Sequence, residues 1–458
     1  MAERYFALPE DYAAPSYEEI VGGITETGIR FKGESVPWGI ATEPTLLPDA
    51  LGAELADLGP TLQNAFHLER VALTGGGKLA QQAEQFVRFS IPNYIPTDPR
   101  YIDKKSLRLM RPDIVITSER MGHGSKDWRI SCGIAEVETR PAATFVYPAL
   151  LEGYGISRAE YMQKWVEAFG DRPWVALYPE EWRLYAEELE AFSNDLIKHG
   201  GRSLGVHNLD RMTHTDVDEI PEDANAYLFG YLDVWARSGS LPLAQVIANR
   251  DRTVVFNPLH YYLETKASLV LFQQEWFLDE LAKRYGNEHA ERLHRWMIEG
   301  YVLNVEAPQD MNTGQMIADH NQWVLKRAGF SPEATESKGV IMPGDHQHPQ
   351  VFTDTLRAGL SGNDGQWIAQ RFQRSRVPQG FYHPDTREPD MFTGSMRISP
   401  LYLSVNRRQV AMLGVMSTVS FGSERAHGGS GKEVKPGMAV MAPVAFGNVP
   451  GVVYSAEK

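Results

Sequence analysis

The stretch Gln322-Trp323-Val324-Leu325-Lys326 organises the rest of the chain. Its short run of apolar and aromatic residues is typical of a buried strand, which Lys326 ends. A polar loop follows as far as Gly339 and leads into a second short apolar run at Val340. The ammonium of a lysine is a compact point charge, and small loop residues let backbone N–H groups approach an anion. A strand-end lysine that faces such a loop, with Lys338 inside it, therefore suits the binding of a polyphosphate.

Composition narrows the class of protein. A chain of 458 residues is too long for one hydrophobic core, so we expect two or three domains. The formal net charge of −14 argues against a general nucleic-acid or anionic-membrane surface, although a local basic pocket is compatible with it. Cys132 is the only cysteine, which excludes an intrachain disulfide and a thiolate metal cluster. With no signal-peptide pattern and no apolar run near the ~20 residues of a membrane span, we expect a cytoplasmic protein.

The chain changes character along its length. Residues 49–73 have helical periodicity, although Gly59-Pro60 should break that helix. Strands alternate with helices from about residue 158 to 257, which predicts a parallel sheet. Within that region we expect a helix at 224–235. After Lys326 strands dominate, so the fold class is α/β with an α+β C-terminal part.

Two acids stand out on a predicted strand. Glu136 and Glu138 are two residues apart, so they point to the same side. Two carboxylates on one side repel each other unless a cation lies between them, and Mg²⁺ takes carboxylate oxygens together with substrate phosphates. The alternative is a solvent-facing strand with ordinary acidic residues. The apolar approach Cys132-Gly133-Ile134 favours an interior strand and a magnesium site.

Four segments then follow in a characteristic order. Asn257-Pro258 ends a strand, and Lys266 opens the next apolar helix. Next come Val324-Leu325-Lys326 with its loop, the strand 367–372, whose backbone could hydrogen-bond a flat base, and the strand that Arg397 opens. In this order the segments resemble the circularly permuted ATP-grasp ligases of the eukaryotic-type glutathione synthetase and glutathionylspermidine synthetase kind. The resemblance covers about residues 108–445.

The resemblance implies a circularly permuted ATP-grasp fold with a substrate domain and a lid. It implies an N-terminal part of the substrate domain at 1–107, a substrate and metal-binding region at 108–304, and a nucleotide-binding and lid region at 305–458. Lys266 and Lys326 would hold the ATP phosphates. The further residues implied at the nucleotide are Asn257, Lys338, Gly339 and Gln370, of which Gln370 lines the adenine slot.

The metal and substrate residues follow from the same resemblance. Glu136 and Glu138 would bind Mg²⁺ together with an acid of the lid, either Glu333 or Glu336. Arg140 and Arg397 are the candidate catalytic residues. Arg140 suits a clamp on a carboxylate or acyl phosphate, and Arg397 could reach phosphate or substrate. For both, an ordinary surface arginine is the open alternative.

The function that the resemblance implies is an ADP-forming, ATP-dependent ligase. It would join a small-molecule carboxylate to an amine, such as an amino acid, through an acyl phosphate, and a homodimer is an open option. The sequence departs from the family pattern in four places. Glu138 stands where Asn is usual, the lid carries few glycines, and the acid of the lid that completes the metal site in relatives could be Glu333 or Glu336. The fourth is Ser417-Thr418, which stands where relatives often place basic residues. A catalytically silent protein that binds a nucleotide or metabolite is the alternative. An enzyme that phosphorylates a non-carboxylate acceptor is a third.

Overall fold

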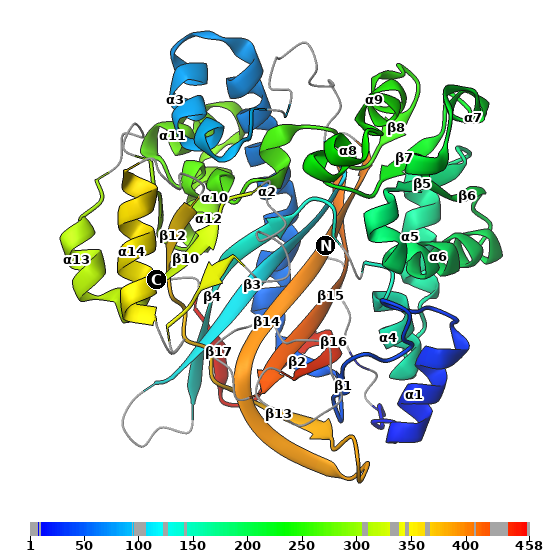
Figure 1. Ribbon diagram of the computed structural model, residues 1–458. Helices are drawn as coiled ribbons and strands as arrows, with labels where there is room; N and C mark the ends of the chain where they lie inside the picture. The colour runs from blue at the N-terminus through cyan, green and yellow to red at the C-terminus, as the bar shows by residue number, and fades with distance from the viewer. Residues whose placement is uncertain are drawn as a thin grey trace.

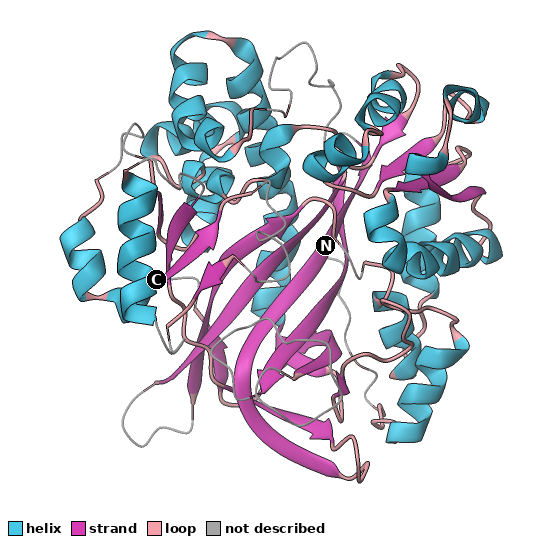
Figure 2. Cartoon of the chain, viewed as in Figure 1, coloured by secondary structure: helices cyan, strands magenta, loops and turns pink. Residues whose placement is uncertain are grey.

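The computed structural model describes most of the chain. The described residues are 8, 11–93, 95, 107–121, 127–141, 144–304, 310–329, 339–343, 348–361, 367–406, 409–421 and 438–455. They form a mixed α/β fold in which helices lie around a central curled sheet (Figure 2). None of the helices in these ranges has the length and apolar character needed to cross a membrane.

The largest sheet runs through the middle of the molecule (Figure 1). The order of its strands is β1-β16-β15-β14-β3-β4-β17, with β13 paired to β14 and β2 paired to β16. Their bounds are β1 (Gly39–Ile40), β2 (Thr45–Pro48), β3 (Leu109–Arg120), β4 (Trp128–Glu138), β13 (Val377–Tyr382), β14 (Pro389–Asn406), β15 (Gln409–Phe421), β16 (Ala439–Gly447) and β17 (Val452–Tyr454). The three expected regions 1–107, 108–304 and 305–458 each contribute strands to this sheet. Their bounds as domains remain predictions.

One end of the large sheet closes on itself. The long strand β14 curves strongly there (Figure 1), and β13 pairs with its first half. A bridge between Ala41 and Phe381 then joins the chain just after β1 to β13. Because β1 also pairs with β16, the strands β13, β14, β15, β16 and β1 complete a ring.

Two smaller sheets flank the large one. The first is antiparallel, with the order β11 (Val340–Ile341), β10 (Trp323–Arg327), β12 (Trp367–Arg371) and β9 (Gly300–Val302). The second is parallel, with the order β6 (Ser203–Asn208), β5 (Trp174–Tyr178), β7 (Asn225–Leu228) and β8 (Val254–Val255). Its parallel pairing confirms the expectation drawn from the alternating pattern.

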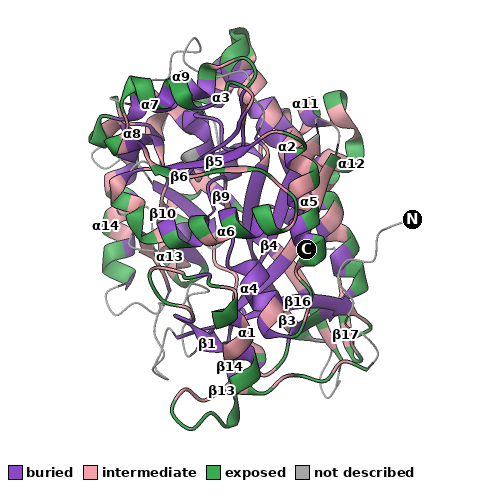
Figure 3. Ribbon diagram, turned by 90° about the vertical axis from the view of Figure 1, so that its right-hand side faces the viewer, coloured by how far each residue is buried: buried purple, intermediate pink, exposed green. Residues whose placement is uncertain are grey.

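Helices fill the space around the sheets, and the strands beneath them are largely buried (Figure 3). Their bounds are α1 (Tyr17–Glu26), α2 (Asp49–Gly75), α3 (Gly77–Val87), α4 (Tyr147–Gly153), α5 (Ala159–Phe169), α6 (Ala186–Lys198), α7 (His214–Glu219), α8 (Leu232–Ser238), α9 (Leu241–Asn249), α10 (Ala267–Leu271), α11 (Glu275–Tyr285), α12 (Asn287–Trp296), α13 (Thr313–Ala318) and α14 (His348–Leu360). Short 3₁₀ turns occur at Arg88–Ser90, Glu180–Tyr185, Leu209–Arg211, Tyr261–Glu264 and His320–Gln322. The antiparallel sheet, with α13 and α14, has a hydrophobic core separate from the main one.

Helix α2 is continuous through Pro60, so the expected break is wrong. The packing explains why. A Cβ on Gly59 would lie 2.5 Å from the Tyr402 ring, so glycine lets the helix lie directly on β14. The Tyr402 hydroxyl donates a hydrogen bond of 2.6 Å to the carbonyl of Leu55, one turn before the proline. Burial against the sheet thus holds the helix together at its weakest point.

The expected helix at 224–235 is also wrong, because its first part is strand β7. All four residues of β7 are buried, and the strand pairs with β5 on one side and β8 on the other. Only the last part of the expected range, from Leu232, is helical in α8. Pairing on both edges overrides the local preference of this short apolar segment.

Candidate functional site

A β-bulge in β4 sets the direction of the two acids. Asp113 of β3 pairs with Glu136, but the next residue, Ile114, pairs with Ile134, so Ala135 is an extra residue. A bulge reverses which face of the sheet the following residues present. Residues opposite each other on paired strands share a face, so Glu136 lies on the face of Asp113, and Glu138 on the face of its partner Arg111. The two glutamates therefore share a side, as their spacing predicts.

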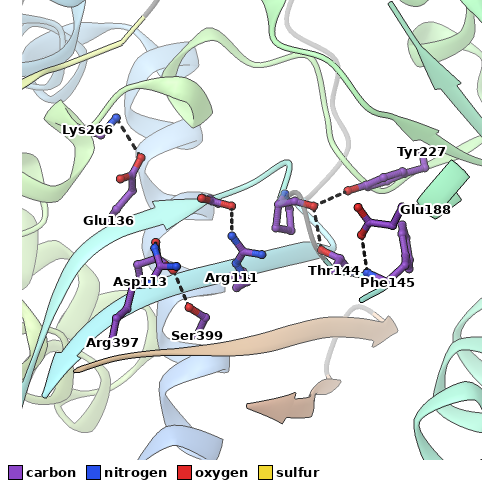
Figure 4. Close-up of polar contacts among 12 residues, drawn as sticks. Arg111, Asp113, Glu136, Thr144, Phe145, Glu188, Tyr227, Lys266, Arg397 and Ser399 are labelled. Atoms are coloured by element: carbon purple, nitrogen blue, oxygen red, sulfur yellow. Dashed lines mark hydrogen bonds and ion pairs between the residues drawn. The ribbon is translucent and has the colours of Figure 1, made fainter. Parts of the chain in front are cut away.

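Two ion pairs lie on this face, one partly buried and one buried (Figure 4). Arg111 Nη2 lies 2.5 Å from Glu138 Oε2, and Arg397 Nη1 of β14 lies 2.5 Å from Asp113 Oδ2. The Ser399 hydroxyl donates to the second oxygen of Asp113 at 2.8 Å. Burial raises the pKa of the Glu138 carboxyl to about 7, and the Arg111 guanidinium opposes that rise. Arg397 is therefore buried and paired, so the alternative of an ordinary surface arginine is wrong.

Lys326 reaches the bulge from the antiparallel sheet. Its Nζ donates to the carbonyl of Ala135 at 3.0 Å and to Gln370 Oε1 at 2.7 Å. The Gln370 amide in turn donates to the carbonyl of Ile134 at 3.3 Å. Burial lowers the pKa of Lys326 to about 8, while Glu136 opposes the shift and Lys266 adds to it. Gln370, expected at the adenine, lies here between the two sheets as the partner of Lys326.

Lys266 reaches the same place from a third segment. It precedes α10, and its backbone N–H donates to the carbonyl of Ala328, which follows β10. Its Nζ lies 3.0 Å from Glu136 Oε1 (Figure 4). Both side chains are largely covered, at 11% exposed for Lys266 and 26% for Glu136. The two lysines singled out from the sequence are therefore brought together, with Glu136 beside both.

The other expected residues brace this centre or fall outside the described residues. Asn257 is fully buried, and its amide donates to the carbonyl of Thr139 at 2.6 Å. Arg140 is 1% exposed and donates to the carbonyl of Pro258 at 2.9 Å, so it is not an ordinary surface arginine. The carbonyl of Gly339 accepts a bond from the Arg327 N–H at the described base of the lid loop. Lys338, Glu333 and Glu336 lie outside the described residues.

Glu136 and Glu138 differ in how well they suit a magnesium ion. In the described part of the chain no three His, Cys, Asp or Glu side chains form a ready metal cluster. Mg²⁺ is usually held by one or two carboxylates, with phosphates and waters completing its shell. Glu136, a partly exposed carboxylate beside two lysines, fits that mode. Glu138 is less suited to it, because its Oε2 is bonded to Arg111.

Sequence reasoning missed several residues of this site. Arg111 and Asp113 alternate on a strand like Glu136 and Glu138, and that spacing was the available signal. Glu188 of α6 also escaped notice; its Oε1 accepts a bond of 2.9 Å from the backbone N–H of Phe145 (Figure 4). The Tyr227 hydroxyl of β7 donates to the carbonyl of Pro141 at 3.3 Å. No local pattern marked these last two, which tie the segment after β4 to the parallel sheet.

Comparison with known proteins places the fold. No protein-family model and no curated protein sequence matches this chain. Among solved structures, the chain is similar to a glutathione synthetase-like effector from Globodera pallida in its apo form, with a TM-score of 0.55 over 93% of this chain and 95% of that one. The chain therefore shares the overall fold of that effector. The two sequences are 12% identical, so the similarity speaks for the fold alone.

Proposed function

We propose that this protein is an ADP-forming, ATP-dependent carboxylate–amine ligase of the circularly permuted ATP-grasp type. The observation that carries the proposal is the meeting of Lys266, Lys326 and Glu136 at one point. These residues come from three separate segments of the chain and have the charges that a nucleotide with its cation requires. The fold shared with the glutathione synthetase-like effector supports the same proposal.

In this proposal the lysines neutralise the phosphates of ATP. Lys326 is held by two acceptors, so its charge is fixed in place before the nucleotide arrives. Glu136 would hold a magnesium ion, and that ion would supply positive charge that offsets the charge of the phosphates. The substrate carboxylate would attack the γ-phosphorus of ATP, and ADP would leave. The amine would then displace phosphate from the acyl phosphate to give the amide.

Two arginines, Arg111 and Arg397, would bind the carboxylate substrate. Arg111 and Arg397 lie on the same face of the large sheet as Glu136, and each is held by an acid, the partly buried Glu138 and the buried Asp113 respectively. A planar guanidinium suits the paired oxygens of a carboxylate or an acyl phosphate. Arg140 would position the site. Its bond to the carbonyl of Pro258 joins the end of β4, which carries the acids, to the segment that leads to Lys266.

The test is ATP turnover with a panel of carboxylates and amino acids. ADP release would be measured, and mass spectrometry would look for a product lighter by one water than its two parents combined. Lys266→Met and Lys326→Met should abolish ADP formation. Lys283→Ala is the matched control, because the Lys283 side chain is 78% exposed on α11. Normal turnover in either site variant would exclude this site.

A second candidate is a protein that binds a nucleotide or small metabolite without turnover. The observation in its favour is the position of Ser417, where relatives often place basic residues. The Ser417 hydroxyl contacts Thr45 Oγ1 at 2.7 Å and donates to the carbonyl of Ala442 at 3.2 Å, so it is used by the fold. A nucleotide-induced rise in melting temperature with no ADP release from any substrate pair would favour this candidate.

A further inference from the structure

A buried chain of polar groups lies beside the turn that carries Lys266. Ser268 follows Lys266 at the start of α10, and its side chain is buried. The Ser268 Oγ lies 2.7 Å from Oε1 of Glu69, which belongs to α2. It also lies 3.1 Å from the carbonyl oxygen of Tyr262, which precedes Lys266 in the sequence. The chain of polar groups therefore joins the segments on both sides of Lys266 to helix α2.

The contacts of Ser268 indicate where a proton lies. Glu69 Oε1 and the Tyr262 carbonyl oxygen are both placed to accept a hydrogen bond from the Ser268 hydroxyl. A hydroxyl carries one proton, so it can make only one full hydrogen bond as a donor. A carbonyl oxygen can only accept, so Tyr262 requires the proton of Ser268. The contact with Glu69 is then a full hydrogen bond only if Glu69 carries a proton on Oε1 and donates it to Ser268 Oγ.

The surroundings of Glu69 favour the same protonated form. The residue is fully buried on α2. Within the part of the chain that the structure describes, its Oε2 has no hydrogen-bond partner and no ion pair involves it. Burial raises the pKa of the Glu69 carboxyl well above its ordinary value, and the contact with Ser268 opposes that rise. A neutral acid can leave one carbonyl oxygen unpaired at far lower cost than a charged carboxylate can.

Glu69 lies beside an apolar contact between the same two helices. Phe66, one turn earlier on α2, packs against Phe272 at the end of α10, with ring centroids 5.1 Å apart. Apolar contacts have no preferred direction, whereas a hydrogen bond fixes distance and angle. The bond from Glu69 to Ser268 therefore sets how α10 lies along α2. Lys266 is the residue that begins α10, so its position follows from that setting.

We propose that Glu69 is a neutral carboxylic acid that positions Lys266 through Ser268. This rests on the proposed function, in which Lys266 binds a phosphate of the nucleotide. Glu69 acts from α2 through α10, so it is a positioning residue. Glutamine has the same shape and an N–H donor, and it should replace Glu69. Methionine has a similar length but no N–H or O–H donor, and it should not.

The first experiment needs no nucleotide. The full chain is treated with a lysine-acylating reagent, and labelling of Lys266 and Lys326 is followed by mass spectrometry. Glu69→Met and Ser268→Ala should label Lys266 severalfold faster than the parent protein, because the turn loses its support, and Lys326 should not change. Glu69→Gln should label like the parent, as should the control Glu275→Met, since Glu275 is exposed on α11. Equal acceleration at both lysines, or none at Lys266, would overturn the positioning role.

The second experiment detects the proton. The infrared difference spectrum between the parent protein and Glu69→Gln at neutral pH should contain the carbonyl band of a protonated carboxyl group. Ser268→Ala should shift this band, because the carboxyl loses the acceptor of its O–H bond, and this variant serves if the glutamine variant does not fold. A carboxylate band in place of the carboxyl band would overturn the neutral acid.

The third experiment measures binding of a fluorescent ADP in the presence of Mg²⁺. Glu69→Met should bind ADP severalfold more weakly than the parent protein, and Glu69→Gln about as tightly as the parent. If ADP never binds but the labelling and the infrared band respond as described, the proposed function fails and the role of Glu69 at Lys266 stands. If ADP binds equally well to the parent and to Glu69→Met, the positioning role fails and the proposed function stands.

Discussion

Nucleotide affinity should fall as the pH rises above about 8, because Lys326 then loses the charge that we propose binds phosphate. Burial lowers the pKa of Lys326 to about 8. Only the protonated ammonium attracts an anion, so binding is strongest below this pKa and weakens above it. For a single titrating group, about 90% is protonated one unit below the pKa and about 10% one unit above it. Affinity at about pH 9 should therefore be about tenfold lower than at about pH 7.

The assay is a titration of fluorescent ADP in the presence of Mg²⁺ at these two pH values. Lys326→Arg is the decisive variant, because a guanidinium stays charged throughout this range. It should bind with little change between the two pH values, whatever its absolute affinity. Lys283→Ala should keep the full difference of about tenfold. Equal affinity of the parent protein at both pH values, or an undiminished loss in Lys326→Arg, would refute the reasoning.

Two further predictions concern stability. Arg397→Met should lower the free energy of unfolding by about 3–5 kcal/mol, because Asp113 is left charged and buried. Asp113→Asn combined with Arg397→Met should recover most of that loss in urea unfolding, and a single variant as stable as the parent would contradict the importance of the pair. Gly59→Ala should cost up to about 2 kcal/mol, because overpacking against Tyr402 outweighs the gain of about 1 kcal/mol in helix propensity. Gly22→Ala in α1, where a Cβ meets nothing within 4 Å, should be neutral or stabilising. Urea unfolding measures both glycine variants.

Lys266, Lys326 and the paired acids could be singled out from the sequence because each has a local signature, and their role at a nucleotide stays a prediction. A lysine at the end of an apolar strand, a lysine after Asn-Pro, and acids two apart on a strand are all visible within a few residues. The ion pair between Arg397 and Asp113 could not be predicted in this way, because the two residues are 284 positions apart in the chain. Their contact depends on which strands become neighbours, and periodicity does not encode that choice.

The bulge at Ala135 carries no sequence signal either. It contains no glycine, and only the register of β3 against β4 reveals it. The continuous course of α2 through Pro60 is a similar case, because the decisive partner, Tyr402, lies in a distant strand. In both places the tertiary environment decided between local conformations of similar energy.

Strand β16 pairs with strands from the opposite end of the chain, and this affects how the protein folds. Residues 39–40 and 45–48 run parallel to this strand, which begins only at residue 439. During synthesis the first strands must wait for almost the whole polypeptide before their backbone groups find a partner. Such distant pairings slow folding and leave an open edge on β15 that another molecule could join. A chain shortened before residue 438 should accordingly aggregate rather than yield a smaller folded protein.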